Sequence, residues 1–260
     1  MLKSIRLVSI CLTIATSFAA GALLPSCKNG ERKESVRIAL ASNFLPVAED
    51  LAVLFERDTG VHVELVSGST GKLYAQIVNG APYDLFLAAD RERPEKLRKG
   101  GKTIGNVTPY AIGSLVVIGP SFPNDAVSDW KNLKILEFKH LAIANPDIAP
   151  YGRASVEALR YSGQFVDLNG RIVQGENISQ AYHFVSSGNA EIGIISRSQW
   201  MKDRAKWSGS LVIAVPTDAH EPIEQCAVLL TENQFASQFL KFLGSDKATE
   251  TIRATGYNIP

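Results

Sequence analysis

The sequence predicts an α/β fold with two lobes, in which mostly parallel sheets are flanked by helices. Segments typical of strands and of helices alternate along the chain, as they do where helices connect and cover parallel strands. No long disordered linker interrupts this alternation. The 234 residues after position 26 are enough for two lobes of about 100 residues each.

In the first half of the chain, strands are predicted at short apolar runs, and helices where apolar residues recur every three or four positions. Pro46 fits only the first turn of the first helix, and Gly60 fits its end. Ser42 and Asn43 are expected to cap this helix. The strands are expected at residues 36–42, 61–68 and 83–89, and the helices at residues 44–60, 72–80 and 91–101.

The second half of the chain shows the same alternation of predicted strands and helices. The chain is expected to cross between the lobes near residues 110–118 and 216–229. Lobe 1 would then comprise residues 36–113 plus 225–260, and lobe 2 residues 114–224. The strands are expected at residues 113–120, 140–146, 169–175, 190–196, 210–216 and 226–230, and the helices at residues 150–163, 177–189 and 233–245.

The first residues have the pattern of a bacterial export signal. Two positive charges precede an apolar run over residues 7–24. The segment LPSC that follows matches a lipoprotein signal, in which Cys27 carries a lipid that tethers the protein to a membrane. An ordinary cleaved signal and an uncleaved anchor helix are the alternatives. We expect a signal peptide over residues 1–26 and a polar tether over residues 27–35.

The remaining composition argues against several classes of function. Residues 27–260 hold 25 Lys and Arg (27 minus the two in the signal) and 26 Asp and Glu, a net charge of about −1. Nucleic-acid binding therefore lacks an electrostatic basis. The four His residues show no metal-ligand spacing, so we expect no free metal cation. Cys226 stands in an apolar run and is expected to be a buried thiol.

The most informative pattern is a set of four junctions where a strand ends and a helix begins through small or polar residues. The first turn of a helix has unpaired backbone N–H groups and a partial positive charge, so such a junction can bind an anion without any cation. Each junction alone is better explained by ordinary helix capping, so the prediction of an anion site rests on the set of four. The four lie at residues 41–43, 69–71, 150–152 and 176–179.

The second junction, GSTGK, also suggests a nucleotide-binding loop, but its spacing excludes one. The phosphate-binding motif G-x-x-x-x-G-K-[ST] would place its first Gly at Val66 and a hydroxyl residue at Leu73. Lys72 is expected to be a solvated residue on a helix face. No nucleophile motif surrounds any Ser, so we expect no enzyme and no catalytic residues.

Five segments together resemble the molybdate-binding proteins of bacterial ABC importers. The resemblance spans most of residues 36–260 and implies a type II periplasmic-binding-protein fold, with the ligand cleft between two lobes. The segments are ALASNFLPVAEDLAVLFERDTG, GSTGKLYAQIVNGAPYDLFLAAD, GSLVVIGP, LAIANPDIAPYGRASVEAL and GNAEIGIIS.

The resemblance also implies which residues hold the anion. The serine at the first helix matches Ser42, and the serine of the family's second loop matches Thr70, with Ser69 beside it. The family's backbone N–H donors match Tyr151 and Ile178. Thr70 keeps the hydroxyl of the serine that it replaces and adds a methyl group that narrows the pocket.

One further position departs from some members of the family. They supply a tyrosine hydroxyl where this chain has Ser196, which lacks the reach of a tyrosine and is expected only as a secondary contact, like Ser69. Neutral donors suit molybdate and tungstate, which are fully ionised dianions, whereas phosphate keeps a proton near neutrality and benefits from a carboxylate acceptor. Sulfate would satisfy the same donors, so the size of the cavity must exclude it.

The sequence therefore predicts an extracytoplasmic solute-binding protein that captures molybdate or tungstate and delivers it to an ABC permease in the inner membrane. We expect a lipid-anchored, periplasmic or cell-surface monomer that needs no cofactor and binds no nucleic acid. A receptor for sulfate or phosphate, an exported enzyme on the same fold, and an adhesive or signalling lipoprotein are the alternatives.

Overall fold

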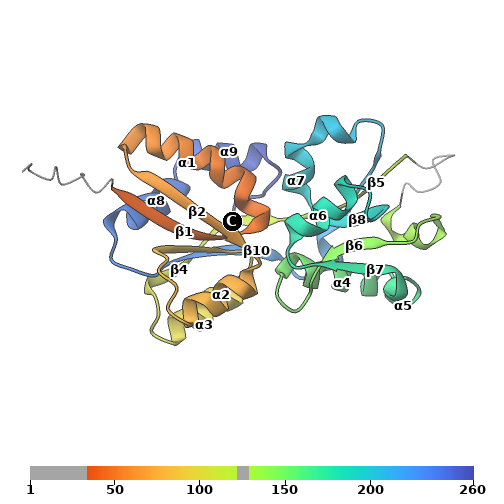
Figure 1. The fold of residues 1–260 in the computed structure, drawn as a ribbon, viewed down its shortest axis with the longest axis horizontal. Helices are drawn as coiled ribbons and strands as arrows, with labels where there is room; N and C mark the ends of the chain where they lie inside the picture. Colours follow the sequence, from red (N-terminus) through yellow and green to blue (C-terminus); the bar gives the residue numbers. More distant parts are fainter. Residues whose placement is uncertain (1–33, 122–128) are drawn as a thin grey trace, which may run out of the picture. The chain divides into compact units, whose positions relative to one another are not determined.

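The computed structural model describes residues 34–121 and 129–260, which form two five-stranded sheets with helices around them (Figure 1). The predicted signal peptide and Cys27 lie outside the described residues. Within the described part of the chain, none of the helices combines the length and the apolar character needed to cross a membrane.

The first sheet is built from the start of the chain and one later strand. Its β1 pairs in parallel with β2 and β3, whereas β10 runs antiparallel between β3 and β4. β1 begins at Ser35, the last residue of the expected tether. The strand order is β2 (His62–Gly68), β1 (Ser35–Ala41), β3 (Leu85–Ala88), β10 (Ile223–Leu229) and β4 (Ile104–Gly113).

The second sheet repeats this arrangement with the middle of the chain. Its β6 pairs in parallel with β7 and β8, and β5 runs antiparallel between β8 and β9. The chain leaves the first sheet between Gly113 and Leu115 and returns between Ala214 and Ile223. The strand order is β7 (Ile172–Gly175), β6 (Leu141–Ala144), β8 (Ile192–Ser196), β5 (Leu115–Gly119) and β9 (Leu211–Ala214).

Helices cover both faces of the first sheet because its central strands are apolar on both sides. In β1, Ile38 packs into a core with α1, α8 and α9, and the next residue, Ala39, packs into a separate core with α2 and α3. Alternate residues of a strand point to opposite faces of the sheet, so each layer of helices buries the apolar residues of one face. These helices are α1 (Leu45–Thr59), α2 (Thr70–Val78), α3 (Glu92–Lys99), α8 (Gln234–Leu243) and α9 (Asp246–Ala254).

The second sheet shares one large core with its own helices. Short 3₁₀ turns complete the described elements. The helices are α4 (Pro150–Tyr161), α5 (Phe165–Leu168), α6 (Ile178–Ser186) and α7 (Arg197–Lys202). The 3₁₀ turns are η1 (Ser42–Phe44), η3 (Trp130–Ile135), η4 (Asn169–Arg171), η5 (Arg204–Trp207) and η6 (Thr217–Ala219).

The α/β prediction is confirmed, with corrections. The sheets are mixed and not mostly parallel, because β10 and β5 each run against their neighbours. β4 was not among the expected strands; it contains Pro109 and lies at the edge of its sheet, where proline is tolerated. α9 was also not expected, since its charged sequence has few apolar residues. Ser42 and Asn43 form a 3₁₀ turn and do not cap a helix through their side chains.

Candidate functional site

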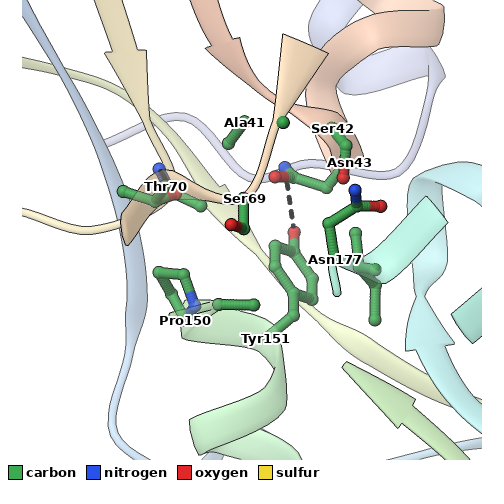
Figure 2. Close-up of a pocket in the computed structure, with 12 residues that line it drawn as sticks. Ala41, Ser42, Asn43, Ser69, Thr70, Pro150, Tyr151 and Asn177 are labelled. Carbon is green, nitrogen blue, oxygen red and sulfur yellow. Dashed lines mark hydrogen bonds between the residues drawn. The ribbon is translucent and has the colours of Figure 1, made fainter. Parts of the chain in front are cut away.

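A small cavity lies where the four junctions meet (Figure 2). Its volume is about 10 Å³, which is room for about one water molecule. The first sheet contributes the residues that follow β1, β2 and β3, and the second sheet contributes the starts of α4 and α6. The cavity therefore lies at the carboxyl ends of parallel strands, the usual place for ligands in open α/β sheets. It is lined by Ala41, Ser42, Asn43, Gly68, Ser69, Thr70, Ala89, Ala149, Pro150, Tyr151, Asn177 and Ile178.

Each junction presents the first turn of a helix to this cavity. Thr70 and Ile178 are the first residues of α2 and α6, and Tyr151 is the second residue of α4. Asn43 lies in the 3₁₀ turn that leads into α1. The backbone N–H groups of a first helical turn have no acceptor within the helix, so these residues offer donors to a ligand.

The hydroxyl groups at the cavity have different partners. The Oγ of Ser69 is buried and has no hydrogen-bond partner within residues 34–121 and 129–260, although Ser69 occupies the cap position of α2. The Oγ1 of Thr70 accepts a hydrogen bond of 3.1 Å from the backbone N–H of Ala89. Ser42 is buried beside them. Ser69 therefore has the hydroxyl group that most needs a partner from a ligand.

Charge is absent from the lining of the cavity. The twelve described lining residues include no Asp, Glu, Lys, Arg or His. Across the described ranges, no group of three or more His, Cys, Asp or Glu is placed to hold a metal ion. The site therefore offers hydrogen-bond donors and helix N-termini but no cation and no acidic acceptor.

Two of the residues singled out from the sequence lie elsewhere. Ser196 is buried outside the cavity lining, where its Oγ donates to Oε1 of Gln199 at 2.8 Å. Lys72 is not merely solvated, because its Nζ forms an ion pair of 2.8 Å with Glu176. This pair joins the start of α2 to the junction before α6.

Other contacts also join the elements of the two sheets around the cavity. The backbone N–H of Gly71 donates to the carbonyl of Ile148 at 2.8 Å. The Oγ of Ser179 donates to the carbonyl of Ser42 at 3.1 Å. Farther out, Arg153 pairs with Glu92 at 3.1 Å. The two halves therefore meet through main-chain and charged contacts on several sides of the site.

A buried hydrogen-bond network behind the cavity was missed from the sequence. The Nδ2 of Asn43 donates to Oε1 of Gln225 at 2.9 Å and to the hydroxyl of Tyr257 at 3.0 Å. The Nε2 of Gln225 donates to the hydroxyl of Tyr151 at 3.2 Å. Tyr110 donates to the Oε1 of Gln225 at 3.1 Å. A signal was available, since Gln225 is an uncharged amide directly before the apolar run of residues 226–230, and buried polar groups need partners.

The phenols of this network remain protonated over the physiological range. Burial raises the pKa of Tyr110 and of Tyr151 well above the usual value. Burial also raises the pKa of Tyr257 to about 12. The network is thus neutral, and it places no negative charge behind the cavity.

Comparison with known proteins identifies the class to which this architecture belongs. Residues 36–258 match the family of bacterial extracellular solute-binding proteins. The chain therefore belongs to this family. The fold and the cavity between two sheets are consistent with that membership.

Two relatives that match almost the whole chain are molybdate-binding proteins. The chain is 43% identical over 247 residues to the molybdate-binding protein ModA of Azotobacter vinelandii, covering 93% of this chain and 96% of that protein. It is 38% identical over 247 residues to ModA of Rhodobacter capsulatus, covering 94% of each. The solved structure of the periplasmic molybdate-binding protein of Azotobacter vinelandii superposes with a TM-score of 0.80 at 36% identity, covering 86% of this chain and 99% of that one.

Proposed function

We propose that this protein captures molybdate or tungstate outside the cytoplasm and delivers the anion to an ABC permease. The observation that carries the proposal is a cavity lined by uncharged donors from four helix starts, with one buried serine hydroxyl that has no partner among the described residues. The similarity to molybdate-binding relatives over almost the whole chain supports the same ligand.

The charge of the ligand follows from the electrostatics of the site. Each helix N-terminus carries about half a positive elementary charge, so four of them supply about +2. Molybdate and tungstate carry two negative charges at neutral pH and have no proton to donate. The absence of an acidic acceptor among the described lining residues therefore disfavours phosphate, which keeps a proton near neutrality.

The proposed contacts combine hydroxyls with backbone donors. Ser42 and Thr70 donate through their hydroxyls, and Tyr151 and Ile178 through their backbone N–H groups. Ser69 joins them as a principal donor, because its Oγ is buried with no partner in the part of the chain that the structure describes. Each such hydrogen bond to a charged group contributes about 1.5–3 kcal/mol, so a few of them hold a dianion once water is excluded.

Delivery requires that the two halves of the chain open and close. We propose lobes of residues 36–113 plus 225–260 and of residues 114–224, which close over the anion and present the closed form to the permease. Nothing in this function requires a cofactor or a reaction, and we propose a monomer. The LPSC segment supports a lipid anchor at Cys27 and a periplasmic or cell-surface location. Membrane fractionation of cells that produce the Cys27→Ser variant tests the anchor, which this change should remove.

Calorimetric titration with molybdate, tungstate, sulfate, phosphate and chromate tests the ligand. We expect tight binding of molybdate and tungstate, weaker binding of the smaller sulfate and chromate, and no binding of phosphate. Binding of phosphate alone, or of none of the five anions, would refute the proposal.

A further inference from the structure

Asn43 and Tyr151 both line the cavity, and their side chains form a hydrogen bond behind it. Asn43 follows β1 of the first sheet, and Tyr151 lies at the start of α4 beside the second sheet. The Nδ2 of Asn43 lies 3.5 Å from the hydroxyl of Tyr151, as the dashed line in Figure 2 shows. Their backbones carry donors on opposite walls of the cavity, so this contact joins the two walls.

Gln225, which lies in β10 of the first sheet, forms hydrogen bonds with both of these residues. Its Oε1 accepts from Asn43 at 2.9 Å, and its Nε2 donates to Tyr151 at 3.2 Å. The register between β10 and β4 shifts at Gln225, and such irregularities re-aim side chains. All three residues are at most 2% exposed, so water cannot replace their hydrogen bonds if either wall shifts in either direction.

The absence of a side chain at Gly113 leaves space for the hydroxyl group of Tyr151. A Cβ atom at Gly113 would lie 2.0 Å from the hydroxyl oxygen of Tyr151 and 3.1 Å from Nε2 of Gln225. Gly113 ends β4, at the point where the chain passes from the first sheet to the second. A side chain at this position would displace the phenol.

We propose that Asn43, Tyr151 and Gln225 act as positioning residues that set the width of the cavity and so select molybdate over sulfate. This inference rests on the proposed function. The two anions have the same charge and shape, but the molybdate tetrahedron is larger. The donors can close around sulfate only if the walls approach, and a buried network with fixed partners resists that movement. Without the network, the walls adapt to either anion.

The test measures selectivity in Tyr151→Phe, which keeps the backbone donor of Tyr151 and removes only the hydroxyl. Calorimetry on the purified protein, with competition titrations for the weaker ligand, gives the affinities for molybdate, tungstate and sulfate. We expect the molybdate-to-sulfate affinity ratio to fall about tenfold, which corresponds to about 1.4 kcal/mol. The molybdate-to-tungstate ratio should stay constant, because these two anions have nearly equal size.

Gly113→Ala provides a second route to the same change, since it displaces the phenol without altering it. Tyr182→Phe is the matched control, because that phenol bonds to Asp203 and Trp207 and does not line the cavity. It should leave both ratios unchanged.

The outcomes separate this inference from the proposed function. If the unaltered protein binds neither molybdate nor tungstate, the proposed function fails and the inference fails with it. If the unaltered protein selects molybdate, and both variants lose affinity for all three anions by one common factor, only the inference is overturned. Loss of cooperative unfolding in both variants also overturns it, because the network would then be needed for folding.

Discussion

Gly71→Ala should weaken anion binding while leaving the free protein as stable as before or slightly more so. Gly71 is the second residue of α2, and its N–H donates across to the carbonyl of Ile148. A Cβ atom there would lie 2.9 Å from the oxygen and 3.0 Å from the Cα of Ile148. These are backbone atoms, so a change of rotamer cannot relieve the contact.

The loss of affinity expected for Gly71→Ala has two contributions. Separating the two backbones removes one hydrogen bond, worth about 0.5–1.5 kcal/mol, and overpacking at a close contact costs about 1–3 kcal/mol. A combined cost of about 2–4 kcal/mol corresponds to a loss of affinity of roughly thirtyfold to several hundredfold. In the open form the two backbones are apart, and alanine in a helix is favoured over glycine by about 0.5–1 kcal/mol.

Calorimetric titration with molybdate gives the affinity, and thermal unfolding without ligand gives the stability. Gly170→Ala is the matched control, since a Cβ atom at Gly170 would meet nothing within 4 Å. Unchanged molybdate affinity in Gly71→Ala would refute the closure argument. A parallel loss of affinity and of unfolding temperature would show that Gly71 matters for folding and not for closure.

Three further changes follow from the same geometry. Ser69→Ala should lower molybdate affinity roughly ten- to a hundredfold with little change in unfolding temperature, because the Oγ of Ser69 has no partner in the described chain to lose. Thr70→Val should lower both the affinity and the unfolding temperature, since it leaves the N–H of Ala89 unpaired. Lys72→Ala should reduce affinity less than about fivefold in calorimetric titrations, because its ion pair with Glu176 is half exposed, and high salt should abolish the difference. The folded pKa of Tyr257, about 12, lies above the usual value of 10.0, so its contribution to stability should be complete below pH 10 and lost as the pH rises towards 12; denaturant unfolding across this range measures the loss.

Much of the fold could be predicted from the sequence because local signals agreed with one another. The apolar spacing in residues 44–60, with Pro46 near the start and Gly60 at the end, marks α1 almost to the residue. β4 could not be predicted in the same way, because the features that make it a strand are not local. Its Pro109 is compatible with a strand only because no further strand of the first sheet pairs beyond it.

The candidate site was predictable in its outline and not in its details. The small and polar residues at four strand ends carry a local signal, and the topology brings them to one cavity. The hydroxyl of Thr70 has a hydrogen-bond partner and that of Ser69 has none in the described chain. This difference is not visible in the local sequence, since it depends on the N–H of Ala89, nineteen residues after Thr70. Gln225 likewise gains its role from partners more than seventy residues away in the chain.

The GSTGK segment shows how closely binding and closure are combined in this molecule. Ser69 places a hydroxyl at the cavity that has no partner within residues 34–121 and 129–260, and Thr70 supports the turn after β3 through Ala89. Gly71 contacts the other half of the chain through its backbone, and Lys72 does so through its side chain. Because these contacts come from adjacent residues at one helix start, an anion bound to Ser69 as we propose would also bring Gly71 and Lys72 towards their partners. Under this proposal ligand binding and closure favour each other, which is the coupling that a delivery protein needs.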